Sequence, residues 1–97
     1  MEIRIQAIHF DASQKLEEFI NRKAERLARR FASISLIDVT LKVVKPETAM
    51  NKEAIVKAVV PQQDDMVADK TADTFEEAID MCLEAIERQL EKVKGRK

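Results

Sequence analysis

Six cations lie along one segment of the chain at spacings that place them on one side of a helix. Between positions 14 and 31 the sequence carries six Lys or Arg residues against three Glu. At about 100° per residue, the six fall within about 120° of one another, and the three Glu lie off that stripe. The six are Lys15, Arg22, Lys23, Arg26, Arg29 and Arg30. Aligned cations can meet successive phosphates of an RNA backbone and release its condensed counterions, so this stripe is a candidate phosphate-binding surface.

The chemistry of the stripe has two interpretations. Four of the six residues are Arg, whose planar guanidinium can engage phosphate oxygens bidentately. The alternative is a solvated helix face, on which the aliphatic stems of Lys and Arg cover the edge of the core. A charge pattern on one helix does not choose between them.

A second group of cations lies near the end of the chain. Arg88 and Lys92 are four residues apart and therefore share a helix face, and Lys94, Arg96 and Lys97 extend the positive charge. The alternative explanation is that cations at a helix C-terminus are favourable, by about 0.3–1 kcal/mol each. We expect the acids of this segment to occupy a different face, and the two basic ridges to form one positive groove. Those acids are Asp80, Glu84, Glu87 and Glu91.

The overall charge of the chain opposes nucleic-acid binding, but its distribution does not. The net charge is −1, whereas nucleic-acid-binding domains are usually basic. Residues 47–84 carry three Lys against ten Asp or Glu, and residues 85–97 carry five Lys or Arg against two Glu. An acidic remainder would repel RNA and so fix which face docks.

Catalytic arrangements are poorly supported by the residue types. His9 is the only histidine, Cys82 falls on the apolar stripe of a helix, and Gly95 is the only glycine. A Cys/His or Ser/His/Asp set is therefore poorly supported, and the sequence offers no paired-cysteine zinc site and no glycine-rich phosphate loop. We predict no enzyme activity, cofactor, metal or small-molecule substrate. All four aromatics are Phe and at least three look like core, so RNA recognition would run through phosphates, sugars and shape.

Periodicity predicts the elements that must position these cations. A period of two indicates strands, a period of three to four indicates helices, and Ser13 and the Thr74/Glu77 capping box mark helix starts. Pro46 would end the second strand because it lacks an amide donor. The predicted strands span about 1–9, 36–45, 53–61 and 66–71, and the predicted helices about 14–31 and 75–94.

This order, βαβββα, predicts an α+β two-layer sandwich. Two helices with one apolar stripe each and an antiparallel four-stranded sheet bury every apolar face if both helices lie on one side of the sheet. The strand-rich half resembles double-stranded-RNA-binding domains. We expect one domain over residues 1–97, with the last few residues flexible. The lone cysteine, the charged N-terminus and the lack of a long apolar run predict a cytoplasmic protein without a membrane segment.

The last helix carries a family resemblance. The run AIDMCLEAIERQLEKVKGRK resembles the closing helix of the ribosome-associated inhibitor/hibernation-promoting factor family, whose pattern is roughly A-I-D/N, a spacer, then L-x-R-Q-L-x-K. The opening strand, His9, the Ser13 cap and the helix after it are also similar to that family, so the resemblance covers essentially the whole chain. The residues that fill the R-Q-L pattern, with Ile in place of Leu, are Ile86, Arg88, Gln89, Leu90 and Lys92.

Two features depart from the family pattern. Thr74, Phe75 and Glu76 stand where the family often has Asp-Met-Tyr, so any role of that Tyr is absent. The segment PQQDD replaces a region near Pro61 that usually holds a Gly, which leaves the turn type open.

The resemblance implies a βαβββα fold and binding to small-subunit rRNA in the mRNA channel, overlapping the tRNA sites. The family's basic contacts carry over to Lys23, Arg26, Arg29 or Arg30, Arg88 and Lys92. The length resembles the short form, which either promotes ribosome dimers with a second factor or holds single ribosomes inactive; the sequence leaves both open. The rival from another class is a protein–protein adaptor whose basic helical face binds an acidic partner. We predict an rRNA-binding hibernation factor whose site adds Lys15, Arg22 and Lys94 to those residues.

Overall fold

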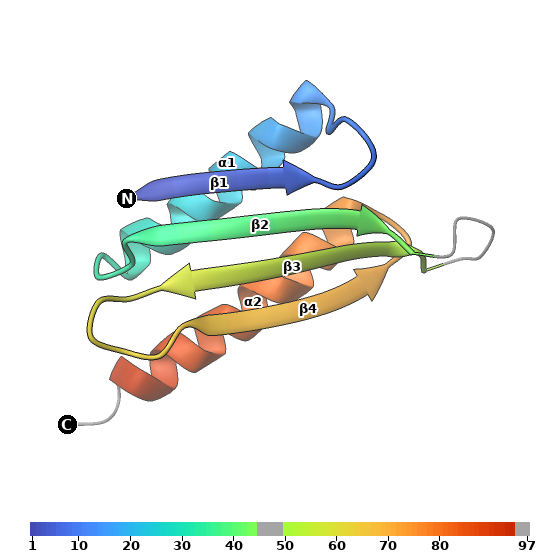
Figure 1. Ribbon diagram of the computed structural model, residues 1–97. Coiled ribbons are helices and arrows are strands. Elements are labelled where there is room, and N and C mark those ends of the chain that lie inside the picture. Colours follow the sequence, from blue (N-terminus) through green and yellow to red (C-terminus); the bar gives the residue numbers. More distant parts are fainter. Residues whose placement is uncertain (45–49, 95–97) are drawn as a thin grey trace.

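The computed structural model describes residues 1–44 and 50–94, with the side chain of Lys94 left out. Its elements follow the predicted order βαβββα (Figure 1). The predicted end of the second strand at Pro46 and the predicted flexible C-terminus fall outside the described residues. The elements are β1 (Glu2–Ala7), α1 (Gln14–Arg30), β2 (Leu36–Val43), β3 (Lys52–Val59), β4 (Met66–Ala72) and α2 (Phe75–Lys94).

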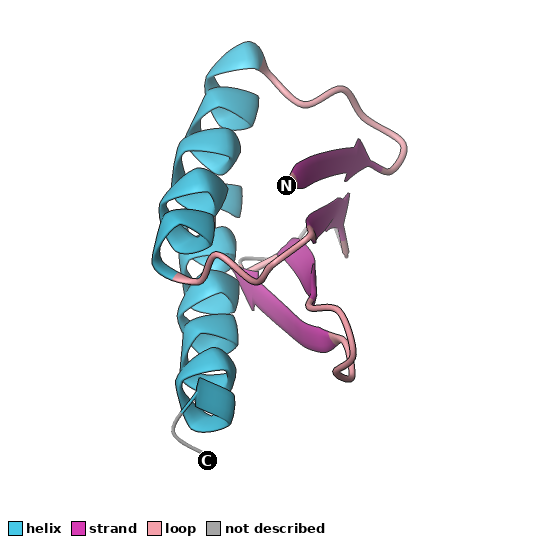
Figure 2. Ribbon diagram, turned by 90° about the vertical axis from the view of Figure 1, so that its left-hand side faces the viewer, coloured by secondary structure: helices cyan, strands magenta, loops and turns pink. Residues whose placement is uncertain are grey.

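The four strands form one sheet in the order β1-β2-β3-β4, and both helices cover the same face of it (Figure 2). The α+β two-layer sandwich is therefore confirmed. The hairpin predicted between the second and third strands is confirmed, and β3 and β4 are also antiparallel. The expectation of an antiparallel sheet is wrong for β1, which pairs parallel to β2. The reason is that α1 is a crossover helix, which returns the chain to the end of the sheet where β1 began.

Local hydrogen bonds fix the helix starts where the sequence predicts them. The Ser13 hydroxyl accepts a hydrogen bond of 3.1 Å from the backbone N–H of Leu16. The Thr74 hydroxyl accepts one of 3.1 Å from the N–H of Glu77, the first half of the predicted capping box. Both bonds satisfy amides that the first helical turn cannot pair internally, so each helix begins at the residue that the sequence predicts.

The core lies between the helices and the sheet. Ile20 of α1, Ile37 of β2 and Ile86 of α2 have no exposed surface. α2 packs across β3 and β4, where the inward positions are mostly small: Ala54, Ala58, Ala68 and Ala72. Small residues let the backbone of α2 approach the sheet closely. This packing turns one face of each helix inward and leaves the opposite face to solvent.

The turn between β3 and β4 takes a conformation that usually requires glycine. Gln62 has a φ of 69°, in the left-handed region, and the N–H of Gln63 donates to the carbonyl of Val60 at 3.2 Å. A left-handed backbone at a non-glycine residue is uncommon. The position at which PQQDD departs from the family pattern therefore keeps a tight turn without a glycine.

Candidate nucleic-acid interface

Four of the predicted site residues form a ridge along the solvent side of α1. Lys15, Arg22, Arg26 and Arg29 are exposed, and none of them makes an ion pair within residues 1–44 and 50–94. At about 100° per residue they lie within about 60° of one another, on the far side of the helix from buried Ile20. At about 1.5 Å per residue the ridge is roughly 21 Å long. We call these four residues the outer ridge.

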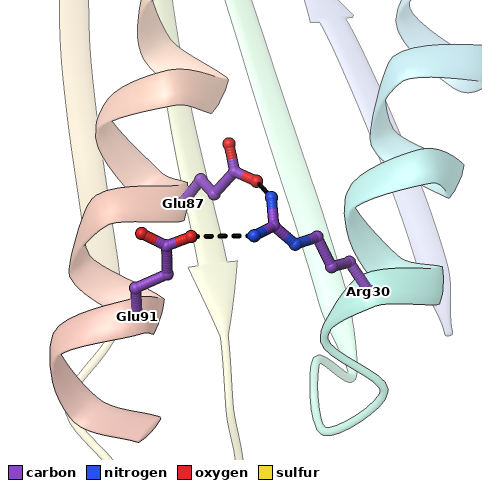
Figure 3. A network of polar contacts seen from close by, with 3 residues as sticks. All are labelled: Arg30, Glu87 and Glu91. Carbon is purple, nitrogen blue, oxygen red and sulfur yellow. Dashed lines mark hydrogen bonds and ion pairs between the residues drawn. The ribbon is translucent and has the colours of Figure 1, made fainter. Parts of the chain in front are cut away.

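The two remaining cations of α1 face α2 instead. Lys23 Nζ lies 3.4 Å from Asp80 Oδ1, and its side chain is 33% exposed. Arg30 is held by two carboxylates, because one terminal nitrogen donates to Glu87 and the other lies 2.9 Å from Glu91 Oε1 (Figure 3). The six predicted cations therefore divide into a free set and a paired set.

The expectation of a purely positive groove between the helices is wrong. The groove is lined on one side by Lys23, Arg26 and Arg30, and on the other by carboxylates of α2. We call Asp80, Glu84, Glu87 and Glu91 the carboxylate row. The sequence pattern predicts these acids on a face away from Arg88, but their face borders the apolar stripe at Leu83, which packs toward α1. Burying that stripe therefore brings the row against the cations of α1.

The ion pairs between α1 and α2 repeat every seven residues, and this spacing can be read in the sequence. Lys23 and Arg30 are seven residues apart, and so are their partners Asp80 and Glu87. Seven residues are about two helical turns, so parallel helices repeat a contact at this interval. The signal that would have predicted these ion pairs is a seven-residue spacing shared by cations on one helix and acids on the other, with each set beside an apolar stripe.

The predicted cations of α2 are less concentrated. The guanidinium of Arg88, whose side chain is 73% exposed, forms an ion pair of 2.7 Å with Glu84 one turn earlier. Lys92 is exposed, and the side chain of Lys94 is outside the part of the chain that the structure describes. α2 carries six Asp or Glu against three Lys or Arg, the opposite balance to α1. The stronger positive surface is therefore the one on α1.

The open face of the sheet has cations too, but carboxylates hold them. Arg4 pairs with Glu2 at 2.7 Å, and Lys42 pairs with Glu53 at 3.3 Å. Lys57 lies 4.0 Å from Asp65. This face therefore has fewer unpaired cations available to bind phosphates than the outer ridge has.

Cys82 has the character of a core residue. It is fully buried, its thiol donates to the carbonyl of Ala54 at 3.1 Å, and burial raises its pKa to about 11. A thiol with a raised pKa holds little nucleophilic thiolate near neutral pH. Within residues 1–44 and 50–94, no group of three or more His, Cys, Asp or Glu residues is arranged to hold a metal ion. Neither helix in the described part of the chain is long and apolar enough to cross a membrane.

Comparison with known protein families identifies the class of this chain. Residues 3–97 match the model of the sigma 54 modulation protein / S30EA ribosomal protein family. The chain belongs to this family, which is one of ribosome-associated proteins and not of enzymes. The resemblance to the hibernation-promoting factor family is thereby confirmed. No match was found among curated proteins.

Solved structures share the fold. A ribosomal subunit interface protein from Coxiella burnetii superposes with a TM-score of 0.86 at 23% sequence identity, over 99% of this chain and 100% of that one. The N-terminal domain of Protein Y from Thermus thermophilus superposes with a TM-score of 0.79 at 16% identity, over 96% of this chain and 99% of that one. At these identities the likeness establishes the βαβββα architecture.

Proposed function

We propose that this chain is a ribosome hibernation factor that binds rRNA of the small subunit in the mRNA and tRNA channel and so inhibits translation. The observation that carries the proposal is the outer ridge, because its four exposed cations are left without carboxylate partners in the described part of a ribosome-associated family member. The other proposed contacts are Arg88, Lys92 and Lys94 of α2. Lys23 and Arg30, which the sequence also predicts as contacts, are engaged by carboxylates of α2.

The shape of the cationic surface suits an RNA backbone. The outer ridge is narrow and straight, because one helix face carries it, and three of its four members are Arg. Phosphates of one strand can contact such a ridge in sequence, and each contact releases counterions. Since the open sheet face pairs its cations internally, the protein would dock with the helices toward rRNA and the sheet away from it.

Inhibition by this mechanism needs no chemical step. A body of this size placed in the channel excludes mRNA and tRNA by volume. The Coxiella burnetii relative is named as a ribosomal subunit interface protein, and we extend this location to the present chain. The proposed site of action is therefore the cytoplasm, with rRNA as partner, no cofactor, and a second factor where ribosomes are paired.

Binding to purified small subunits tests the proposal. We expect the protein to sediment with small subunits and to compete with tRNA, with an affinity that falls steeply as salt rises. Reversing charge at Arg26 and Arg88 together (R26E/R88E) should abolish both effects. The matched control, R4E/K57E, makes the same change in net charge on the open sheet face and should retain both. Tight binding that does not depend on salt, or a R26E/R88E variant that still blocks tRNA, would contradict the proposal.

A further inference from the structure

Three carboxylates of α2 form ion pairs with two cations of α1, and these ion pairs exist only in the folded protein. Asp80 contacts Lys23, and Glu87 and Glu91 both contact Arg30. The partners are separated by 57 to 61 residues along the chain, so folding alone brings them together. Arg26 of the outer ridge lines the same groove as Lys23, Arg30, Asp80 and Glu87. Figure 3 shows Arg30 of α1 pointing across to Glu87 and Glu91 of α2.

These carboxylates compete with an RNA phosphate for the same donors. Arg30 already uses one terminal nitrogen for Glu87 and the other for Glu91, so both prongs of its fork are engaged. A phosphate that displaced one carboxylate would lie close to the other, and like charges at such distances repel. Arg22 and Arg29, in contrast, meet no such competitor in the described part of the chain.

We propose that the carboxylate row is a specificity determinant that withholds Lys23 and Arg30 from phosphates, so that RNA contacts α1 through the outer ridge. This inference rests on the proposed function, and it names the kind of partner. The surface fits one backbone strand lying along α1 for roughly 21 Å, as at the edge of a folded RNA helix. The row thereby lowers the affinity for RNA in general and favours one docking geometry.

Neutralising part of the row tests the idea directly. The double variant Glu87→Gln with Glu91→Gln keeps side-chain shape and removes the charges that hold Arg30. The matched control, Asp38→Asn with Asp64→Asn, raises net charge equally, and neither residue is in an ion pair among the described residues. Surface ion pairs contribute little to folding, so all forms should fold, as circular dichroism and thermal melting would verify.

The readout is affinity for a generic RNA duplex and for small subunits across a salt series. One released cation that gains one phosphate should steepen the salt slope by roughly 0.7–0.9 and tighten duplex binding about five- to eightfold at 0.1 M salt. We expect this change for E87Q/E91Q, a much smaller one for D38N/D64N, and a reduced preference of E87Q/E91Q for small subunits over duplex.

Two results would overturn the inference and differ from a failure of the proposed function. Equal slopes for the two double variants would show that only net charge matters. If E87Q/E91Q kept the wild-type preference for small subunits over the RNA duplex, the row would not be a specificity determinant. If the wild-type protein failed to bind small subunits at all, the proposed function itself would be wrong. The single variant Asp80→Asn, which should release Lys23 alone, gives an independent measure of one cation.

Discussion

Removing two cations from the outer ridge should weaken binding to the small subunit by an amount that depends on salt in a calculable way. The change is Arg22→Gln with Arg29→Gln, the two positions that lie opposite the buried side of α1. Both are exposed, and neither is held by a carboxylate among the described residues, so each is free to contact one phosphate. The expected loss is therefore two phosphate contacts.

The magnitude follows from counterion release. Each phosphate contact contributes about 0.7–0.9 to the slope of log affinity against log salt, so the slope should fall by about 1.4–1.8. At 0.1 M salt this corresponds to a loss of about 25- to 60-fold in affinity, and at 0.3 M to about 5- to 9-fold. The loss should shrink as salt rises, because the missing contacts are electrostatic.

The assay is equilibrium binding of labelled protein to purified small subunits at five salt concentrations. The matched control is Arg4→Gln with Lys57→Gln, which makes the same change in net charge but removes cations that already have carboxylate partners on the open sheet face. The control should keep wild-type affinity within about threefold. An equal loss in both variants, or a loss that does not change with salt, would refute the assignment of the ridge.

Three further predictions concern the scaffold. Burial raises the pKa of Cys82 to about 11, so a thiol reagent at pH 8 should label the native protein at least roughly a hundredfold more slowly than the protein in urea; equal rates would contradict this burial. The carboxyl of Asp69, which is hydrogen-bonded to Glu53, and then burial raise the pKa of Glu53. The folded state therefore binds that proton more tightly than the unfolded state, and stability is lost as pH rises through the raised pKa. The free energy of unfolding of wild type relative to Glu53→Gln should fall between pH 4 and pH 7 in urea titrations, and a constant difference would exclude the effect. Ile86→Ala should cost about 2–5 kcal/mol in the same assay, whereas Met81→Ala on the exposed side of α2 should cost less than about 1 kcal/mol; similar costs would contradict the packing.

The helices and strands were predictable because the apolar residues that face the core recur at the period of a helix or of a strand. The alternation of Ile37, Val39 and Leu41 marks the strand β2, and all three are buried in the structure. Ser13 and Thr74 mark the helix starts because their hydroxyls satisfy backbone amides. The parallel pairing of β1 was not predicted. A two-residue alternation shows which face of a strand is buried, but it does not show which strand lies beside it or whether the two run parallel or antiparallel.

The division of the cations was not predicted from the sequence. A helical projection gives the faces of one helix, but it does not say which flank of an apolar stripe meets the neighbouring helix. The sequence placed the carboxylate row on a different face of α2 from Arg88, but it did not show that this face meets α1. Packing of Leu83 toward α1 brings Asp80 and Glu87 against Lys23 and Arg30. The outer ridge was predictable as a stripe, and its freedom from carboxylate partners required the relative rotation of the two helices.

Directed cleavage of rRNA most directly tests the claim that the helical side docks on the small subunit. Buried Cys82 should not react, so a cysteine introduced on the surface can carry a hydroxyl-radical source alone. Glu25→Cys places the source on α1 beside the outer ridge, and Gln6→Cys places it on the open sheet face. We predict strong cleavage from position 25, confined to rRNA that lines the mRNA and tRNA path, and weak cleavage from position 6. Stronger cleavage from position 6, or cuts from position 25 scattered over the subunit, would contradict the account.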